Sequence, residues 1–132
     1  YQAGTLSGNP LAVAAGLATL RLLDEEAYAR LRTITDALAG GLRDAAASSP
    51  VPVSVVSVPG LVTVFFRPEP PRSFAEAQEC DLEAHGKWCR SLLARGVYPS
   101  PSQFEAWFPS LAHEAENLEL TIEAAAAAFA EL

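Results

Sequence analysis

The sequence is poor in basic residues, in cysteine and in histidine. Nine Lys and Arg stand against 16 Asp and Glu, and Lys87 is the single lysine. The resulting net charge of −7 argues against nucleic acids and anionic membranes as partners, because both attract clustered positive charge. Two thiols, Cys80 and Cys89, with the distant His85 and His113 offer too few soft ligands for a metal site. We therefore expect unpaired, reduced cysteines and no bound metal.

Long apolar runs are also missing. The longest, residues 11–20 and 124–130, fall well short of the roughly 20 residues that a membrane-spanning helix needs. The first residues show no basic stretch followed by a cleavage-type segment. At 132 residues the chain has the length of one domain with a core of its own. The sequence thus predicts a soluble protein that resides in the cytoplasm.

A loop that leads into a helix lies near the first residue. Gly4 and Gly8 precede Asn9, which can cap a helix, and Pro10, which suits the first helical position. Such a junction directs N–H groups and the positive end of the helix dipole at one place, and Thr5 adds a hydroxyl. The loop therefore suits a phosphate. Its spacing matches neither a P-loop nor a dinucleotide fingerprint, so simple helix capping is the alternative.

The segment that follows, residues 10–23, is apolar on every side of the predicted helix. A helix of this kind has to be buried all round, which is difficult in so small a domain. We infer that it packs against other protein, either an upstream domain or another subunit. A central core helix is the alternative.

The remaining pattern predicts an α+β fold with a small, mostly antiparallel sheet and helices packed on one of its faces. In order, we expect helices at 10–23 and 24–48, a hairpin of 53–58 and 61–66, a proline-rich connection at 67–79 with a helical turn near 75–77, a helix at 81–95, short strands at 97–98 and 107–111, and a helix from 114. Within these elements we expect Ser54 and His85 to face solvent and Tyr28 and Leu82 to face the core.

Two separated runs resemble the glutamate-1-semialdehyde 2,1-aminomutase family, a branch of the class III aminotransferases. They are YQAGTLSGNPLA at 1–12, and RGVY at 95–98 followed by PSQFEA at 101–106 and SLAH at 110–113. The resemblance covers nearly the whole chain, but only as the C-terminal third or so of such an enzyme. It implies the small C-terminal domain of fold type I pyridoxal-phosphate enzymes for residues 24–132, with residues 1–23 as cofactor loop and interface helix.

The resemblance also implies a function. Members of the family convert glutamate-1-semialdehyde to 5-aminolevulinate in tetrapyrrole (porphyrin and heme) synthesis, as homodimers that carry pyridoxal 5′-phosphate or pyridoxamine 5′-phosphate. Gly4 and Thr5 match positions that reach the cofactor phosphate of the partner subunit. Tyr1 matches an active-site tyrosine, and Glu105 matches an acidic residue on the substrate side of the pocket. Trp107 departs from the family, which often has glycine there. A merely solvated carboxylate is the alternative for Glu105.

In the family, the lysine that binds the cofactor covalently lies in a large N-terminal domain, upstream of the position of Tyr1. Lys87 stands in a polar helix position with nothing to lower its pKa, so we do not expect it to replace that lysine. We accordingly expect the 132 residues by themselves to be inactive. Two other functions stay open: another class III aminotransferase, which the run at 101–106 disfavours, and a non-catalytic interaction domain.

Overall fold

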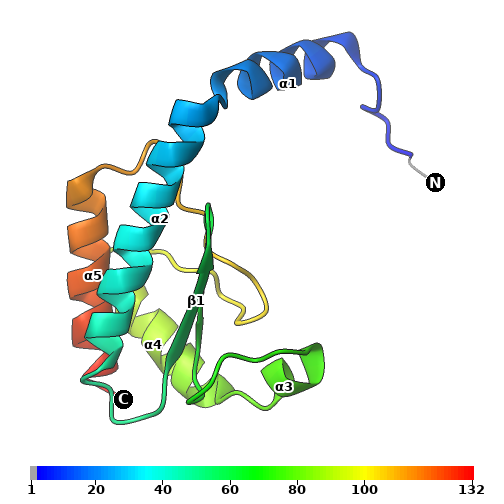
Figure 1. Ribbon diagram of the computed structural model, residues 1–132. Helices are drawn as coiled ribbons and strands as arrows, with labels where there is room; N and C mark the ends of the chain where they lie inside the picture. Colours follow the sequence, from blue (N-terminus) through cyan, green and yellow to red (C-terminus); the bar gives the residue numbers. More distant parts are fainter. Residues whose placement is uncertain (1–2) are drawn as a thin grey trace.

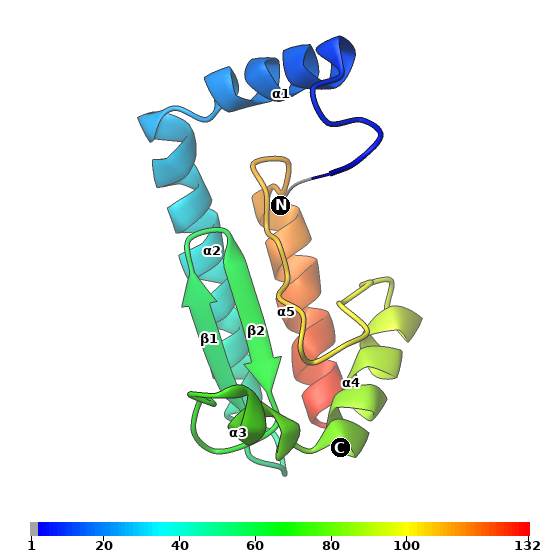
Figure 2. The ribbon, with the colours of Figure 1, turned by 90° about the vertical axis from the view of Figure 1, so that its right-hand side faces the viewer.

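The computed structural model describes residues 3–132. It contains helix α1 (Pro10–Leu22), helix α2 (Glu25–Ala46), strands β1 (Ser54–Val58) and β2 (Leu61–Phe65), the short helix α3 (Phe74–Gln78), helix α4 (Leu82–Ala94) and helix α5 (Ala115–Phe129). Figures 1 and 2 show the β1–β2 hairpin on one side and α2, α5 and α4 on the other, with α1 extending away from this body. The expected α+β fold is confirmed.

Helix α2 is the longest element and carries one face of the core. Asp24 caps it by accepting a hydrogen bond from Ala27 N at 2.8 Å, and two glutamates follow in the first turn, where they suit the helix dipole. Its buried residues recur at helical spacing: Ile34, Thr35, Leu38, Ala39, Leu42 and Ala45. The predicted amphipathic helix is therefore confirmed, although Tyr28, near its start, is half exposed rather than in the core.

The hairpin pairs Val55 with Val64 and Ser57 with Val62. Its turn needs a left-handed residue, and Gly60 supplies it with φ of +86°. Thr35 Oγ1 accepts a hydrogen bond from Gly60 N at 2.9 Å and so ties the turn to α2. Val62, Val64 and Phe66, two residues apart, are all buried against the helices, as the alternation of a half-buried strand requires.

Aromatic rings fill the centre of the core. Trp88 of α4 stacks on Phe129 of α5, with ring centroids 4.9 Å apart, and Phe66 meets Trp88 edge-on at 5.7 Å. All three side chains are almost fully buried. The rings join the hairpin to α4 and α5, and Leu38, Leu42, Leu92, Ala125 and Ala128 pack around them.

The third and fourth strands of the prediction were wrong. Within residues 3–132 the sheet has two strands, and residues 97–98 belong to no strand. The N–H of Val97 donates to Leu92 O of α4 at 3.0 Å, and Pro99, which follows, has no N–H to donate to a ladder. The segment at 107–111 contributes a single antiparallel bridge, in which Trp107 N donates to Val62 O at 2.7 Å.

The predictions of burial or exposure for three side chains were also wrong. His85 is only 6% exposed because Phe66 packs edge-on against its ring at 6.0 Å. Ser54 is buried in a small hollow that Arg43 and Pro70 also line, so the proline-rich connection shields it. Leu82 faces solvent, because it is the first residue of α4 and precedes the turn that packs on the core.

The part of the chain that the structure describes lacks two kinds of feature. No helix there is both long and apolar enough to cross a membrane. Nor do three or more His, Cys, Asp or Glu side chains gather there in a way that could hold a metal ion. Cys80 and Cys89 are free thiols.

Candidate functional site

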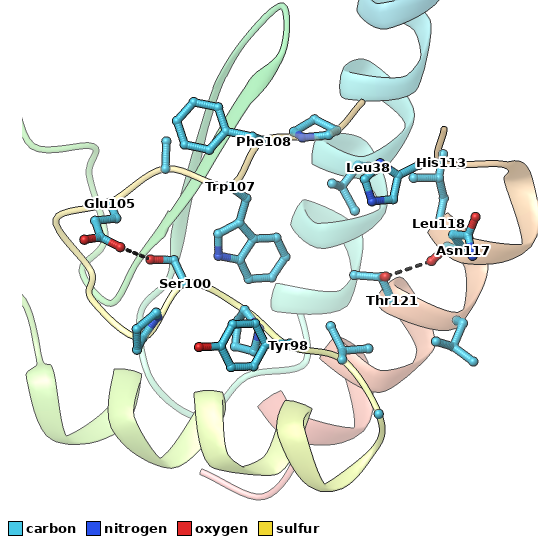
Figure 3. A pocket seen from close by; sticks show the side chains of 17 residues that line it. Leu38, Tyr98, Ser100, Glu105, Trp107, Phe108, His113, Asn117, Leu118 and Thr121 are labelled. Atoms are coloured by element: carbon cyan, nitrogen blue, oxygen red, sulfur yellow. Dashed lines mark hydrogen bonds between the residues drawn. The ribbon is translucent and has the colours of Figure 1, made fainter. Parts of the chain in front are cut away.

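An open cavity of about 900 Å³ lies between the loop that follows α4 and the first turns of α5. Figure 3 shows its walls: Tyr98, Ser100, Glu105 and Trp107 come from the loop, and Thr121 comes from α5. The further lining residues are Leu38, Gly96, Val97, Pro99, Pro101, Ala106, Phe108, Pro109, His113, Asn117, Leu118 and Leu120. The surface is mainly aromatic and apolar, with one carboxylate.

Glu105 supplies that carboxylate. Its Oε2 accepts a hydrogen bond from Ser100 Oγ at 2.9 Å, and its backbone N–H closes a turn onto Ser102 O at 3.1 Å. The side chain is exposed. A carboxylate in an open hollow can bind an ammonium group of a ligand.

Trp107 lies between the two ends of the cavity (Figure 3). Its indole stacks on that of Trp88, with centroids 5.5 Å apart and planes 9° from parallel. The large side chain therefore extends the aromatic core to the cavity surface. The departure from a small residue at this position is accommodated by this stack and by the backbone bridge to Val62.

His113 lies on the other side of Trp107 from Glu105 (Figure 3). Its Nδ1 accepts a hydrogen bond from Ser110 N at 2.9 Å, which closes the turn before α5. Asn117 Oδ1 in turn accepts from Glu114 N at 2.9 Å and completes a capping box. These side chains shape the entry to α5, which is a structural role for His113.

The loop at 4–9 holds the second group of predicted site residues. Two backbone hydrogen bonds, Ser7 N to Gly4 O and Asn9 N to Leu6 O, each 3.0 Å long, fold it into consecutive turns. Asn9 Oδ1 accepts from the N–H groups of Leu11 at 3.0 Å and of Ala12 at 3.2 Å. The cap thus occupies the donors that we expected the helix itself to offer.

The loop nevertheless retains donors of its own. Within residues 3–132, neither the backbone N–H of Thr5 nor its hydroxyl has a hydrogen-bond partner, and the residue is exposed. N–H groups in successive turns together with a hydroxyl form a donor set that suits phosphate oxygens. The residues present therefore fit a phosphate-bearing group, although through the loop and not through the free end of the helix.

The two groups of predicted residues do not form one site within this chain. No residue of 3–22 lines the cavity, and Figure 1 shows the loop at the far end of α1, away from the hairpin and from the segment at 98–109. Tyr1 lies outside the described residues. Lys87 pairs with Glu83 at 2.9 Å on the exposed side of α4 and does not line the cavity.

Sequence reasoning missed a contact within α4 between the buried His85 and the partly buried Cys89. His85 Nε2 lies 3.5 Å from Cys89 Sγ, and that thiol donates to Ser100 O at 3.7 Å. Burial lowers the pKa of His85 and raises the pKa of Cys89 to about 11, so the pair is neutral near pH 7 and the thiol is not a nucleophile. The i, i+4 spacing is a signal that could have indicated the contact.

Gln103 anchors the turn that carries Glu105, a role that its place in the run at 101–106 does not indicate. It is 2% exposed, and its Nε2 donates to Ala77 O of α3 at 2.8 Å. Nothing in the local sequence indicated this contact, because the two residues lie 26 positions apart.

No protein-family model matches the chain, but individual relatives match over almost all of it. Glutamate-1-semialdehyde 2,1-aminomutase of Anaeromyxobacter dehalogenans (strain 2CP-C) is 49% identical over 131 residues, which are 99% of this chain and 30% of that protein. The proteins of the same name from Syntrophobacter fumaroxidans and Deinococcus deserti are 51% and 49% identical, over 98% of this chain and 30% of their own length.

Solved structures agree on the fold. An omega-transaminase from Sphaerobacter thermophilus superposes with a TM-score of 0.80 at 24% identity, over 98% of this chain and 30% of that one. A structure described as a transaminase with PLP bound gives a TM-score of 0.81 at 21% identity, over 99% and 29% of the two chains. By sequence, the chain therefore corresponds to the C-terminal portion of the glutamate-1-semialdehyde 2,1-aminomutase family.

Proposed function

We propose that this chain is the C-terminal part of a pyridoxal-phosphate enzyme that isomerises glutamate-1-semialdehyde to 5-aminolevulinate, a step of porphyrin synthesis. The observation that carries the proposal is the identity of 49–51% to aminomutases over 98% or more of the chain. The chain spans about 30% of the length of those relatives, so the remainder of the catalytic machinery belongs to a preceding large domain. Biosynthetic chemistry of this kind suits the cytoplasm.

The donor loop supports the choice of cofactor. Gly4 and Thr5 would hold the phosphate of pyridoxal 5′-phosphate or pyridoxamine 5′-phosphate through backbone N–H groups and the Thr5 hydroxyl. When bound, the cofactor supplies the electron sink for moving an amino group, while protein groups orient it. No residue of 3–22 lines the cavity of its own chain, and Figure 1 shows the loop at the far end of α1 from α2; both support a homodimer in which each loop reaches the cofactor of the other subunit.

The cavity supports an amino substrate. Glu105 would face the substrate there, because a carboxylate can accept hydrogen bonds from an ammonium group and repel a misplaced carboxylate. Tyr98 and Trp107 would limit the space beside it. Within this reading Glu105 and Tyr1 are the catalytic candidates, and Gly4 and Thr5 bind the cofactor.

The test uses the complete protein that contains this chain, purified with its cofactor. It is supplied with glutamate-1-semialdehyde, and the formation of 5-aminolevulinate is followed. A parallel assay offers an ω-amine with pyruvate as amino acceptor. We expect isomerisation without any amino acceptor. Transamination of the ω-amine with no 5-aminolevulinate would overturn the proposal in favour of another class III aminotransferase, and a protein inactive in both assays would favour an interaction domain.

A further inference from the structure

The turn that carries Glu105 is attached to two helices. The carbonyl oxygen of Ser100 accepts a hydrogen bond from Cys89 Sγ of α4, and the amide of Gln103 donates to Ala77 O of α3. The buried amide and the part-buried thiol fix the backbone on either side of the turn. The polar side chains of the turn therefore extend from a backbone whose position is fixed by these two hydrogen bonds.

From this fixed backbone, the Ser100 side chain contacts Glu105. Its hydroxyl oxygen lies 2.9 Å from Glu105 Oε2 and 3.2 Å from Ser102 O. The hydroxyl has one proton to donate, and an ionised carboxylate that is also the nearer group is the stronger acceptor. An exposed glutamate without such a partner is free to occupy several rotamers. The bond thus limits where the carboxylate can be.

We infer that Ser100 is a positioning residue that holds the Glu105 carboxylate at the wall of the cavity. Ser100 acts through Glu105 and not on the substrate itself. The inference rests on the proposed function, because it assumes that the cavity receives the substrate. Rates of catalysis depend steeply on the placement of charged groups, so a modest hydrogen bond can have a measurable effect.

The test is a double-mutant cycle in the complete, cofactor-loaded protein, made of the wild type, Ser100→Ala, Glu105→Gln and the double variant. Glu105→Gln is expected to lower kcat/KM by about 10- to 100-fold. Ser100→Ala is expected to lower it by about 3- to 10-fold in the wild-type background, the effect of one hydrogen bond, and to have no further effect beside Glu105→Gln. Ser100→Thr keeps the hydroxyl and should restore wild-type values.

Ser102→Ala is the matched control. It removes another hydroxyl of the same turn, one that accepts from Phe104 N at 3.2 Å, and should change kcat/KM by less than about twofold, like any change without a role in the reaction. Cofactor content and the thermal midpoint are recorded for every variant, so that unfolding is not mistaken for lost positioning.

Four results would overturn the inference. The first two are a wild-type kcat/KM in Ser100→Ala, and a loss of kcat/KM on Ser100→Ala that is equal in the wild-type and Glu105→Gln backgrounds. The other two are a loss of kcat/KM in Ser102→Ala as large as that in Ser100→Ala, and a wild-type kcat/KM in Glu105→Gln. The cycle is run on whichever substrate the complete protein converts. If that substrate is an ω-amine, the proposed function fails, while the coupling between Ser100 and Glu105 is still measured and judged by the same criteria.

Discussion

Single side chains characterise the two candidate sites. Thr5 offers a hydroxyl and an N–H that have no partner within residues 3–132, and Glu105 offers a carboxylate held by Ser100. Two polar side chains near them are engaged instead by the fold: Asn9 in the cap of α1 and His113 in the turn before α5. Polar side chains whose hydrogen bonds are made within the chain shape a site, whereas those with free donors or acceptors remain available to a ligand.

Thr5→Val tests the donor loop in the complete protein. Valine keeps the shape of threonine and loses the hydroxyl, and a hydrogen bond to a charged phosphate contributes about 1.5–3 kcal/mol. We therefore expect the affinity for pyridoxal phosphate to fall by about 10- to 100-fold, measured by titration of the apoprotein with the cofactor.

Thr5→Ser retains a hydroxyl and is the control, with an affinity close to that of the wild type. An equal affinity in Thr5→Val would show that Thr5 is only a residue of the turn and does not hold the phosphate.

We expect His85 to make the stability of the fold depend on pH. Its pKa in the folded chain lies below the ordinary value of 6.5, because burial disfavours the charged ring. As the pH falls through 6.5, the unfolded chain binds a proton that the folded chain does not, so the free energy of unfolding decreases until the folded pKa is reached. One such group can contribute at most about 1.4 kcal/mol per pH unit.

His85→Phe should remove this part of the pH dependence, because phenylalanine keeps a ring against Phe66 and cannot bind a proton. Urea unfolding at pH 7.5, 6.5 and 5.5 measures the effect as the difference between the two proteins. If the wild type and the variant lose stability in parallel as the pH falls, burial of His85 is not what causes the loss.

At the scale of elements, the packing of α2 against α5 depends on a glycine. A Cβ built at Gly41 would lie 2.7 Å from Ile122 Cγ1 and still nearer to its Cδ1, whereas a Cβ at Gly40 would meet nothing within 4 Å. Isoleucine is stiff at χ1 in a helix and cannot easily move aside. Gly41 therefore lets the two helices approach, and Gly40 has no such role.

The two adjacent glycines give a matched pair of variants. Gly41→Ala should lower the free energy of unfolding by about 1–3 kcal/mol through overpacking, whereas Gly40→Ala should raise it by about 0.5–1 kcal/mol, the ordinary gain of alanine over glycine in a helix. Urea denaturation measures both. Stabilisation by Gly41→Ala would show that α5 is not closely packed at Ile122.

Local signals explain which elements the sequence could predict. Caps, apolar spacing and the Pro59-Gly60 turn lie within each helix or hairpin, so α2, α4, α5 and the β1–β2 pair were found close to their observed bounds. The bridge at Trp107 joins single residues and has no period to detect. The burial of His85 depends on Phe66, 19 positions away in the sequence and on another element, so no local pattern could indicate it.

Some residues of the candidate sites could likewise be predicted from the sequence, and others could not. Gly4, Thr5 and Glu105 were proposed because their motifs resemble those of a known family. Ser100 and Gln103 were not proposed, because their roles arise from contacts that form only in the folded chain. The Ser100 hydroxyl donates to Glu105 and the Ser100 carbonyl accepts from Cys89 of α4, and Gln103 donates to Ala77 of α3. A motif can therefore propose positions for ligand contact, whereas residues that support those positions become visible only in the folded chain.

At the scale of the whole molecule, α1 is the least integrated element. None of its residues is buried, and Leu11, Leu20 and Leu22 are 80%, 64% and 75% exposed. Figures 1 and 2 show the helix extending from the start of α2 without a neighbour along its length. A helix that is apolar on every side is normally buried, yet the described remainder of this chain leaves α1 exposed. It is therefore not the central core helix of the alternative, and we still expect other protein to cover it.

The last prediction concerns the behaviour of the 132 residues in solution. Contiguous exposed apolar surface of more than a few hundred Å² commonly mediates association, so we expect concentration-dependent self-association through α1. Leu17→Glu should shift the population towards monomer, because a charge placed in an apolar contact loses its hydration without gaining a partner. Sedimentation velocity over a wide range of concentration measures this shift. Thr19→Glu adds the same charge roughly 200° away around the helix, at a position that is already polar, and should have less effect. A monomer at every concentration in the unaltered chain would mean that the apolar surface of α1 does not drive association by itself.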